Sequence, residues 1–398
     1  MQNNKMTNLP QGWEKFNFDN IFYSPSSKNY QLNTKDYLEK GYIPIIDQSK
    51  KFIIGYSNDY EKVFKINNCN NSCIIFGDHT RVLKFIDFDF IVGADGVKIL
   101  LNKDIERFNT KFLFFQLLYK DIPLLGYRRH FSVLKQSTFS IPTLKEQERI
   151  VGILDESFAK IDESIKILEQ DLLNLDELMQ SALQKAFNPL KDNAKENYKL
   201  PQGWEWKSLG EIFNIERGGS PRPIKEFLTD KEDGINWIKI GDIKNQKYLY
   251  KTEEKIIQEG LKKSKLVIEG DLLVSNSMSF GKPVIVKLQK GAIHDGWLLL
   301  KEKINLNKEY FYYLFSSNFM YNFLSYQASG STVKNLNIDK LKQIEIPLPP
   351  LKEQEQIASH LDELSSHVKN LKQNYQAQIK DLQELKKSLL DKAFKGNL

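Results

Sequence analysis

The strongest constraint on the fold of this chain is an internal duplication. The hexapeptide Leu-Pro-Gln-Gly-Trp-Glu occurs at residues 9–14 and again at 200–205, and Leu-Lys-Glu-Gln-Glu occurs at 144–148 and again at 351–355. Each copy therefore runs from a tryptophan-marked start, through a long mixed region, to a helix-forming tail. A duplicated chain predicts a pseudo-twofold molecule, and such a molecule predicts a ligand that also has two halves.

The two tails carry the apolar stripe of paired helices. Apolar residues recur at alternating steps of four and three from Leu154 to Met179, and the second tail repeats this pattern from Leu361. Prolines precede both helices and set their starts near 143 and 350. A helix of about 45 residues rising about 1.5 Å per residue is roughly 65 Å long, too long for one globular core. We therefore expect the two helices to pack on each other.

The linker between the copies predicts the direction of this packing. Residues 188–199 are rich in Asn, Lys and Pro, and about a dozen residues span at most roughly 40 Å. Because the linker is too short to return along the first helix, the second globule begins near the far end of that helix. The second helix then runs back antiparallel to the first. The predicted organisation is a globule at 1–142, a helix at 143–187, a linker at 188–199, a globule at 200–349 and a helix at 350–398.

Both globules have the pattern of mixed, strand-rich domains. Short β-branched or aromatic runs end at Gly, Asn or Asp, and a helical stretch follows them in each copy, around 109–120 and 308–326. An Asp-Gly turn recurs at Asp95-Gly96 and Asp295-Gly296. The fold class is therefore α+β, with two such domains and an antiparallel two-helix coiled coil. The expected strands are 42–46, 52–55, 72–77 and 97–101 in the first copy and 237–241, 271–274, 284–286 and 297–300 in the second.

The charge is unevenly distributed along the chain. The net charge is +6 overall. Over 143–187 five Lys/Arg oppose ten Asp/Glu, which gives −5, and over 351–398 eight oppose seven, which gives +1, so the rest of the chain carries +10. Basic globules favour a polyanionic partner, and an acidic helix favours protein contacts.

Composition excludes several classes of protein. The 41% hydrophobic and 12% aromatic content suits folded cores rather than disorder. There is no run of about 18 uncharged apolar residues and no apolar stretch typical of a signal peptide near the first residue, so we expect a soluble, intracellular protein without membrane contact. Cys69 and Cys73 lie in an Asn-rich stretch without a second pair or a nearby His, which makes a poor zinc site.

The motifs of a catalytic centre are absent from the sequence. There is no phosphate-binding Gly-x-x-x-x-Gly-Lys-Ser/Thr loop, no His-Glu-x-x-His and no Gly-x-Ser-x-Gly. Asn188-Pro189-Leu190 lacks the second proline and the aromatic residue of an amino-methyltransferase motif and suits a helix stop. Glu253-Glu254-Lys255 suits a solvated charge run better than a nuclease site. We expect this chain to catalyse nothing alone.

Several motifs together resemble the specificity subunit of type I restriction-modification systems. These are the two Leu-Pro-x-Gly-Trp openings, the proline-marked Glu-Gln entries into both helices, and Gly330-Ser331-Thr332-Val333-Lys334 before the second helix. Phe76-Gly77-Asp78-His79-Thr80-Arg81 and Arg217-Gly218-Gly219-Ser220-Pro221 are similar to segments of two types of target-recognition domain. The first copy has Lys135-Gln136-Ser137-Thr138 where a Gly-Ser-Thr element would stand, so the two stretches are not assumed to be equivalent.

The resemblance implies a DNA-binding adaptor without cofactors of its own. Each recognition domain would read one half of a bipartite, asymmetric double-stranded DNA target, and the helices would fix the gap between the halves and bind two methyltransferase subunits. Those subunits would supply S-adenosylmethionine, and restriction subunits would supply ATP hydrolysis with Mg²⁺. The physical interpretation agrees, since the distance between reading surfaces sets half-site spacing.

Residue chemistry and loop position select the DNA-contact candidates. Arg and Lys bind phosphates or guanine, and Asn and Gln pair with adenine. Outer-face acids are candidates for methyltransferase contacts. The DNA-binding candidates are His79, Arg81, Arg128, Arg129 and His130 in the first domain and Arg217, Arg222, Asn276, Ser277, Lys334 and Asn335 in the second; the partner-binding candidates are Glu146, Glu156 and Glu163.

Two other functions remain open on the sequence. A coiled-coil scaffold with protein-binding globules would have the same helices with incidental basic charge. A fused restriction enzyme with its own catalytic domain is disfavoured by the chain length and the missing motifs. Binding to random duplex DNA at low salt separates the scaffold from the DNA-binding adaptor.

Overall fold

The computed structural model describes residues 11–69, 71–93, 96–123, 129–187, 200–243, 246–276, 281–328 and 336–398. The chain forms two compact units: the first contains residues up to Leu168 together with Gln376–Leu398, and the second is Glu169–Tyr375. The division crosses both long helices. Each unit therefore comprises one globular domain and part of each helix, and each is described by itself below.

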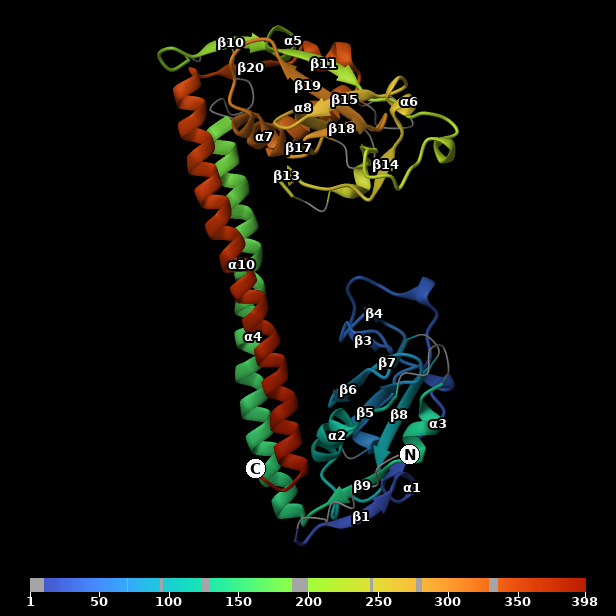
Figure 1. Cartoon of the computed structure of the whole chain (residues 1–398). Coiled ribbons are helices and arrows are strands. Elements are labelled where there is room, and N and C mark those ends of the chain that lie inside the picture. Colours follow the sequence, from blue (N-terminus) through green and yellow to red (C-terminus); the bar gives the residue numbers. More distant parts are fainter. Residues whose placement is uncertain are drawn as a thin grey trace. The chain divides into compact units, whose positions relative to one another are not determined.

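The globular domain of the first unit contains three small sheets (Figure 1). A four-stranded sheet has the order β2-β8-β5-β6, a three-stranded sheet has the order β4-β3-β7, and β1 pairs with β9. The helices α1, α2 and α3 complete the domain. The bounds are β1 Glu14–Asn17, α1 Phe18–Ile21, β2 Phe22–Tyr23, β3 Ile43–Ile46, β4 Gly55–Ser57, β5 Cys73–Gly77, β6 Leu83–Ile86, β7 Ile91–Val92, β8 Val97–Asn102, α2 Thr110–Tyr119, α3 Phe131–Lys135 and β9 Thr138–Ile141.

The domain of the second unit repeats this topology with two additional strands. Its sheets have the orders β11-β19-β16-β17-β13 and β14-β12-β18-β15, and β10 pairs with β20. The additional strands are β13 and β15, at the edges of the two larger sheets. The bounds are β10 Glu205–Ser208, α5 Leu209–Ile212, β11 Phe213–Arg217, β12 Ile235–Ile238, β13 Tyr248–Leu249, β14 Glu254–Ile256, α6 Gln258–Leu261, β15 Lys265–Ile268, β16 Leu272–Ser275, β17 Pro283–Val286, β18 Lys290–Ile293, β19 Trp297–Glu302, α7 Lys308–Ser316, α8 Asn318–Ala328, α9 Ile338–Lys342 and β20 Glu345–Leu348.

The central strand of each domain is buried on both faces. In β5, Ile74 and Phe76 face the core that contains α2, while Cys73 and Ile75 face a second core beneath the smaller sheet. The strand β16 repeats this alternation in the second domain. A strand covered on both faces has a continuous run of apolar residues in its sequence. Both central strands could therefore be predicted correctly from the sequence.

The predicted long helices are α4 (Leu144–Phe187) and α10 (Leu351–Phe394). Each has 44 residues, and their ends correspond without a gap. Within the first unit Asp162 of α4 pairs with Lys386 of α10, and within the second unit Asp176 pairs with Lys372. Arg149 also donates to the carbonyl of Leu398, just after α10, in the first unit, and residues 178–186 line one groove with residues 353–361 in the second. In each unit, residues further along α4 therefore meet residues earlier in α10, which confirms the antiparallel pairing. In Figure 1, α4 is green and α10 is red.

The predicted apolar stripe lies in the contact between the helices. Leu154, Ile161 and Leu175 of α4 are buried, as are Leu361 and Val368 of α10. The stripe fails at two positions, Leu371 and Leu385, which remain exposed.

The glutamine of each repeated Glu-Gln pair joins a long helix to its domain by buried hydrogen bonds, and we call this contact the clamp. Gln147 is 0% exposed and Gln354 is 2% exposed. Gln147 accepts a hydrogen bond from the backbone N–H of Asn109 at 2.8 Å and donates to the carbonyls of Arg107 and Pro142. Because Asn109 is the N-cap of α2, this amide joins the start of one helix to the start of another.

The second copy repeats the clamp with matching atoms. Gln354 accepts from the N–H of Asn307, the N-cap of α7, and donates to the carbonyl of Pro349. Gly12 and Gly203, in the two Gln-Gly-Trp segments, both have positive φ, at 83° and 86°. Only glycine adopts such a conformation readily, which explains its place in both copies.

A repeated carboxylate also joins each domain to its helix. Asp155 of α4 pairs with Lys111 of α2 at 2.7 Å, and Asp362 of α10 pairs with Lys247. Asp362 also accepts a hydrogen bond from Tyr313 at 2.6 Å. Burial, with a smaller contribution from Glu309, raises the pKa of the adjacent Tyr248 hydroxyl to about 12.

Three expectations about the smaller elements need correction. Phe52–Ile54 lie outside the strand, which is β4 and begins at Gly55. The carbonyl of Phe52 accepts from the Lys84 ammonium group, and only the N–H of Ile54 bonds to β3, at the Ile45 carbonyl. The strand expected at 237–241 is β12, Ile235–Ile238. The helical stretch at 308–326 is two helices, separated at Ser317, whose hydroxyl donates to the carbonyl of Leu314.

Candidate nucleic-acid interface

A buried carboxylate organises the loops at one end of the first domain. Asp78 directly follows β5 and is 2% exposed. Its N–H donates to the carbonyl of Gly96 at 2.7 Å, and its carboxylate accepts from the N–H of Phe131 at 2.9 Å. Its carbonyl also accepts from the N–H of His130 at 2.8 Å. One residue therefore joins the β5–β6 turn, the turn before β8 and the loop before α3.

These loops surround a polar hollow of about 730 Å³. Its lining includes hydroxyl groups, a histidine and three basic side chains, which are donors that bind phosphates and base edges. The Lys98 ammonium group lies 4.0 Å from the Asp78 carboxylate and 5.4 Å from the centre of the Phe131 ring. The lining residues are Ser24, Pro25, Ser26, Ser27, Lys28, Gln31, Asp78, His79, Gly96, Val97, Lys98, Arg129 and Phe131.

Two of the predicted DNA contacts of the first domain lie at this hollow. His79 and Arg129 are exposed and line it. Arg81 has a left-handed backbone, with φ 61°, and donates to the carbonyl of Ile122 at 2.5 Å, so part of its guanidinium group is used inside the domain. The sequence did not predict Lys28 and Lys98, which also line the hollow. Lys98 lies within the apolar strand β8, so its sequence context did not suggest a DNA contact.

His130 needs a correction. The side chain is 0% exposed, and its Nδ1 lies 2.9 Å from the carbonyl of Asp78. A fully buried ring cannot touch DNA in this conformation. His130 instead fixes the loop that carries Arg129.

The second domain has the same arrangement around an amide. Asn276 directly follows β16 and is 0% exposed. Its N–H donates to the carbonyl of Gly296 at 2.7 Å, and its side-chain oxygen accepts from the N–H of Leu336 at 2.7 Å. Asn276 therefore occupies the place that Asp78 has in the first domain. Its burial contradicts the prediction that it contacts DNA directly.

The exposed arginines of the second domain gather around Asp295. Arg217 donates from Nε to the Asp295 carbonyl at 3.0 Å, and Ser220 donates from its hydroxyl to the carboxylate at 3.0 Å. Arg222 lies 4.0 Å from the same carboxylate, with its side chain 82% exposed. Asp295 thus contacts both arginines at the domain surface, Arg217 through its carbonyl and Arg222 through its carboxylate. Exposed guanidinium groups are suited to meet an anionic ligand.

Some predicted residues lie outside the described part of the chain. These are Arg128, Ser277, Lys334 and Asn335, together with Gly330-Ser331-Thr332-Val333-Lys334, Asp95, the linker 188–199 and Asn188-Pro189-Leu190. The Lys135–Thr138 stretch runs from the last residue of α3 to the first residue of β9, so its counterpart in the second copy is 342–345, from the end of α9 to the start of β20. By chain order, the counterpart of 330–334 is the segment before α3.

The three partner-binding candidates lie on α4. Glu146 makes two hydrogen bonds with Arg149, at 2.7 and 2.8 Å, which hold its pKa below the usual range. Glu156 pairs with Lys160 one helical turn away, and Glu163 is exposed. Two of the three acids are thus paired within their own helix.

Each unit also has an apolar groove on its helices. In the first unit a groove of about 520 Å³ lies between Ile167 and Leu385. In the second unit a groove of about 570 Å³ is lined by Leu178, Ile357 and Leu361. Exposed apolar side chains on a paired helix are typical of a surface that binds a further helix.

The described residues lack two features that other functions would require. Among them, no group of three or more His, Cys, Asp or Glu side chains is arranged to hold a metal ion. No helix in the described ranges is long and apolar enough to cross a membrane.

Comparison with known proteins identifies the repeated architecture. The family profile described as Type I restriction modification DNA specificity domain matches residues 10–172 and 201–381. The specificity subunit of the type I restriction enzyme EcoR124I/EcoR124II of Escherichia coli is 24% identical over 347 residues, covering 85% of this chain and 83% of that protein. The StySPI specificity subunit of Salmonella potsdam is 23% identical, covering 98% and 90%.

Two solved structures share the fold. A chain of a type I R-M system, described for its complex assembly and conformational transition, superposes with a TM-score of 0.73 at 22% identity, covering 98% of this chain and 99% of that chain. The HsdS subunit from Thermoanaerobacter tengcongensis gives a TM-score of 0.55 at 21% identity, covering 98% of each.

Proposed function

Because this chain belongs to the family of type I restriction-modification DNA specificity subunits and carries two specificity domains, we propose that each domain reads one half of a bipartite, asymmetric DNA target. The observation that carries this proposal is the repeated loop cluster. Asp78 and Asn276 hold equivalent loops, yet the surrounding side chains differ. Equal scaffolds with unequal side chains are suited to two different half-sites.

The chain contributes recognition and no catalysis. The methyltransferase subunits supply S-adenosylmethionine, and restriction subunits supply ATP hydrolysis with Mg²⁺. The complex acts in the cytoplasm, where it meets the DNA. The excess of basic residues outside the helices makes DNA binding sensitive to salt, because each phosphate contact releases a counterion.

Exchange of one recognition domain tests this function. Replacing residues 15–135 by the corresponding segment of a relative is expected to change the first half-site and leave the second unchanged, because the loop cluster of the first domain lies within 15–135. The measurement is the sequence preference of DNA methylation by the complex with methyltransferase. Exchange of 208–342 is the matched control and should change only the second half-site.

An unchanged first half-site after this exchange would reject the proposal. The scaffold alternative is separated by mobility shift with random duplex DNA at low salt. The DNA-binding adaptor gives a shift that disappears as salt rises, and a protein-binding scaffold gives none.

The apolar grooves are the proposed docking sites for two methyltransferase subunits, one on each unit. The grooves combine exposed leucine and isoleucine side chains with an acidic helix, which suits an amphipathic helix with a basic edge. Glu163 and the paired acids Glu146 and Glu156 contribute to this charge.

Charge placed in a groove should prevent docking. Leu178→Glu and Leu385→Glu are each expected to weaken methyltransferase binding by about tenfold or more, since each would bury an unpaired carboxylate in the interface. Binding is measured by titration calorimetry with purified methyltransferase. Leu173→Glu is the matched control, because Leu173 is exposed on the same helix and does not line the groove. Equal losses in all three variants would contradict the assignment.

A further inference from the structure

Lys98 is the recessed cation of the polar hollow in the first domain. It lies on β8 between the buried residues Val97 and Ile99, and its side chain is 33% exposed. The other basic residues of the lining, Lys28 and Arg129, are exposed. A ligand seated in the hollow therefore meets a cation that lies deeper than the domain surface.

The ammonium group of Lys98 has donors available for a ligand. Its Nζ lies 4.0 Å from Oδ2 of Asp78, beyond hydrogen-bond distance, and 5.4 Å from the centre of the Phe131 ring. The other oxygen of Asp78 accepts from the N–H of Phe131. Within the described part of the chain, Nζ of Lys98 donates no hydrogen bond. An anion that accepts such bonds would stabilise this charge further.

The second domain shows that the fold requires neither of the two charges. Lys98 and Leu298 are counterparts, because each pairs across the central sheet with the residue two positions before Asp78 or Asn276. Leu298 is 0% exposed and lies in the core of its domain. A leucine and an amide thus replace a lysine and a carboxylate together. A ligand explains the charge of Lys98 better than the scaffold does.

The described lining of the hollow suits a phosphate group. It has three basic side chains, three serines and a single carboxylate, Asp78, which is 2% exposed. Ammonium, guanidinium and hydroxyl groups are donors that bind phosphate oxygens. The concave shape favours the same ligand, because phosphates are outermost on a duplex whereas base edges lie recessed in its grooves. The donor residues are Ser24, Ser26, Ser27, Lys28, Lys98 and Arg129.

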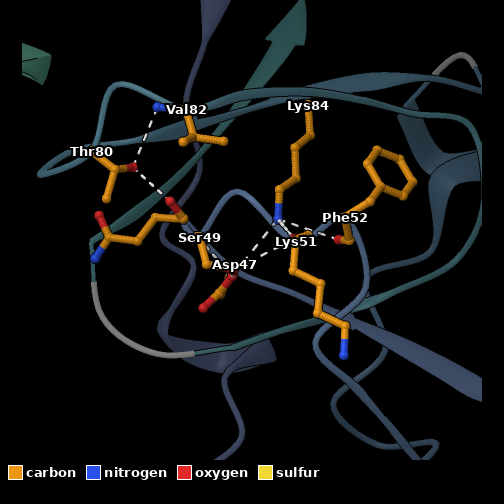
Figure 2. A network of polar contacts seen from close by, with 8 residues as sticks. Asp47, Ser49, Lys51, Phe52, Thr80, Val82 and Lys84 are labelled. Atoms are coloured by element: carbon orange, nitrogen blue, oxygen red, sulfur yellow. Dashed lines mark hydrogen bonds and ion pairs between the residues drawn. The ribbon is translucent and has the colours of Figure 1, made fainter. Parts of the chain in front are cut away.

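The wall of the hollow that carries His79 is held by hydrogen bonds to the segment after β3. The N–H of His79 donates to the side-chain oxygen of Gln48 at 3.1 Å, and the Thr80 hydroxyl donates to the Gln48 carbonyl at 2.6 Å. The Thr80 hydroxyl also accepts from the N–H of Val82 at 3.3 Å (Figure 2). The β5–β6 turn is therefore fixed on both sides of His79.

A buried lysine anchors the segment that receives these bonds. Lys84 of β6 is 3% exposed, and its ammonium group donates to the carbonyls of Lys51 and Phe52 at 2.6 and 3.2 Å. Figure 2 shows the Lys84 side chain directed at these carbonyls and at Asp47, whose carboxylate lies 3.7 Å away. The wall is thus ordered before a ligand arrives, which reduces the entropy lost on binding.

We propose that this hollow binds one backbone phosphate of the first half-site, with Lys98 as the recessed cation that contacts it. The assignment rests on the proposed function, since it requires that the first domain binds DNA. It adds a phosphate site whose internal cation the second domain replaces by Leu298, so the two domains hold the DNA backbone by different residues. Such a contact positions the duplex and does not read its bases.

Neutral phosphate substitutes test the contact directly. The target sequence is first read from methylation of a DNA library with randomised half-sites by the complex with methyltransferase. Duplexes of that sequence then carry a single methylphosphonate at each backbone position of the first half-site in turn, and their affinity for the complex is measured. At the position that Lys98 contacts, we expect the wild-type complex to lose about tenfold in affinity.

Lys98→Met should lose about as much affinity on unmodified DNA, because it removes the same contact from the protein side. The methylphosphonate at that position should then cost nothing further in the variant. The dependence of log K on log salt should become shallower by about 0.9, the value for one phosphate, with the preferred bases of both half-sites unchanged. Lys15→Met is the matched control and should keep the full methylphosphonate pattern, because Lys15 is exposed on β1 and does not line the hollow.

The double variant Asp78→Asn/Lys98→Leu reproduces the pair of the second domain and leaves no buried carboxylate without its cation. It should lose the same methylphosphonate effect as Lys98→Met. Persistence of every methylphosphonate effect in both variants, or a changed base preference with an unchanged salt dependence, would overturn the inference and leave the proposed function intact. A wild-type complex that methylates without any sequence preference would reject the proposed function itself.

Discussion

Replacing Gln147 by leucine is expected to destabilise the contact between α2 and α4 by about 3–5 kcal/mol. The substitution leaves the N–H of Asn109 and the carbonyls of Arg107 and Pro142 without the amide that binds them. Each buried polar group left unpaired costs about 1–3 kcal/mol. Hydrogen exchange of the α2 amides measures the effect locally, and we expect exchange to accelerate by about 150-fold or more.

A matched control separates the clamp from helix propensity. Gln170→Leu makes the same chemical change on the exposed face of α4, where Gln170 donates to Asn174 one turn away. We expect an effect within about 0.5 kcal/mol there. Gln354→Leu should reproduce the loss in the second domain, at the start of α7. If Gln147→Leu behaved like Gln170→Leu, the buried amide would contribute packing alone.

The sequence showed that the Glu-Gln pair is repeated but not which task it performs. Repetition marks a shared structural requirement, and the surrounding helix pattern indicated partner contacts on the outer face. In the structure Glu146 is on the surface and the adjacent Gln147 is fully buried. The N-cap residues Asn109 and Asn307, which bind the two glutamines, are distant in sequence from the Glu-Gln pairs. Only the folded chain therefore reveals the clamp.

Helices and central strands could be predicted because their local patterns agree with their burial. The run Cys73–Gly77 is apolar throughout since both faces of β5 are covered. Phe52–Ile54 looked similar and forms no strand. The carbonyl of Phe52 binds the Lys84 side chain, which no local pattern can indicate.

Site residues were harder to predict because polar loop residues have two opposite uses. Residues His79, Arg217 and Arg222 are exposed, whereas His130 and Asn276 are buried supports for the same loops. Both kinds are polar and lie near glycines in the sequence. Asp78 and Asn276 share one feature that distinguishes them: each directly follows a strand that is buried on both faces, so the position predicts burial.

Removing the buried carboxylate of Asp78 should abolish recognition of the first half-site. Asp78→Leu leaves the N–H of Phe131 without its acceptor and releases the loop that carries Arg129. We expect methylation that depends on the first half-site to fall by about 30-fold or more, equivalent to about 2 kcal/mol. The rate is measured on DNA with the intact target and on DNA with each half-site altered in turn.

Asp78→Asn should retain recognition, because Asn276 shows that an amide oxygen performs the same role, accepting from the N–H of Leu336 at 2.7 Å. The asparagine also removes the carboxylate 4.0 Å from Lys98. The lysine charge is then uncompensated at the hollow, so binding to DNA of any sequence should strengthen and depend more steeply on salt. Equal losses in Asp78→Leu and Asp78→Asn would mean that the negative charge, rather than the hydrogen bond to the loop, is what recognition requires.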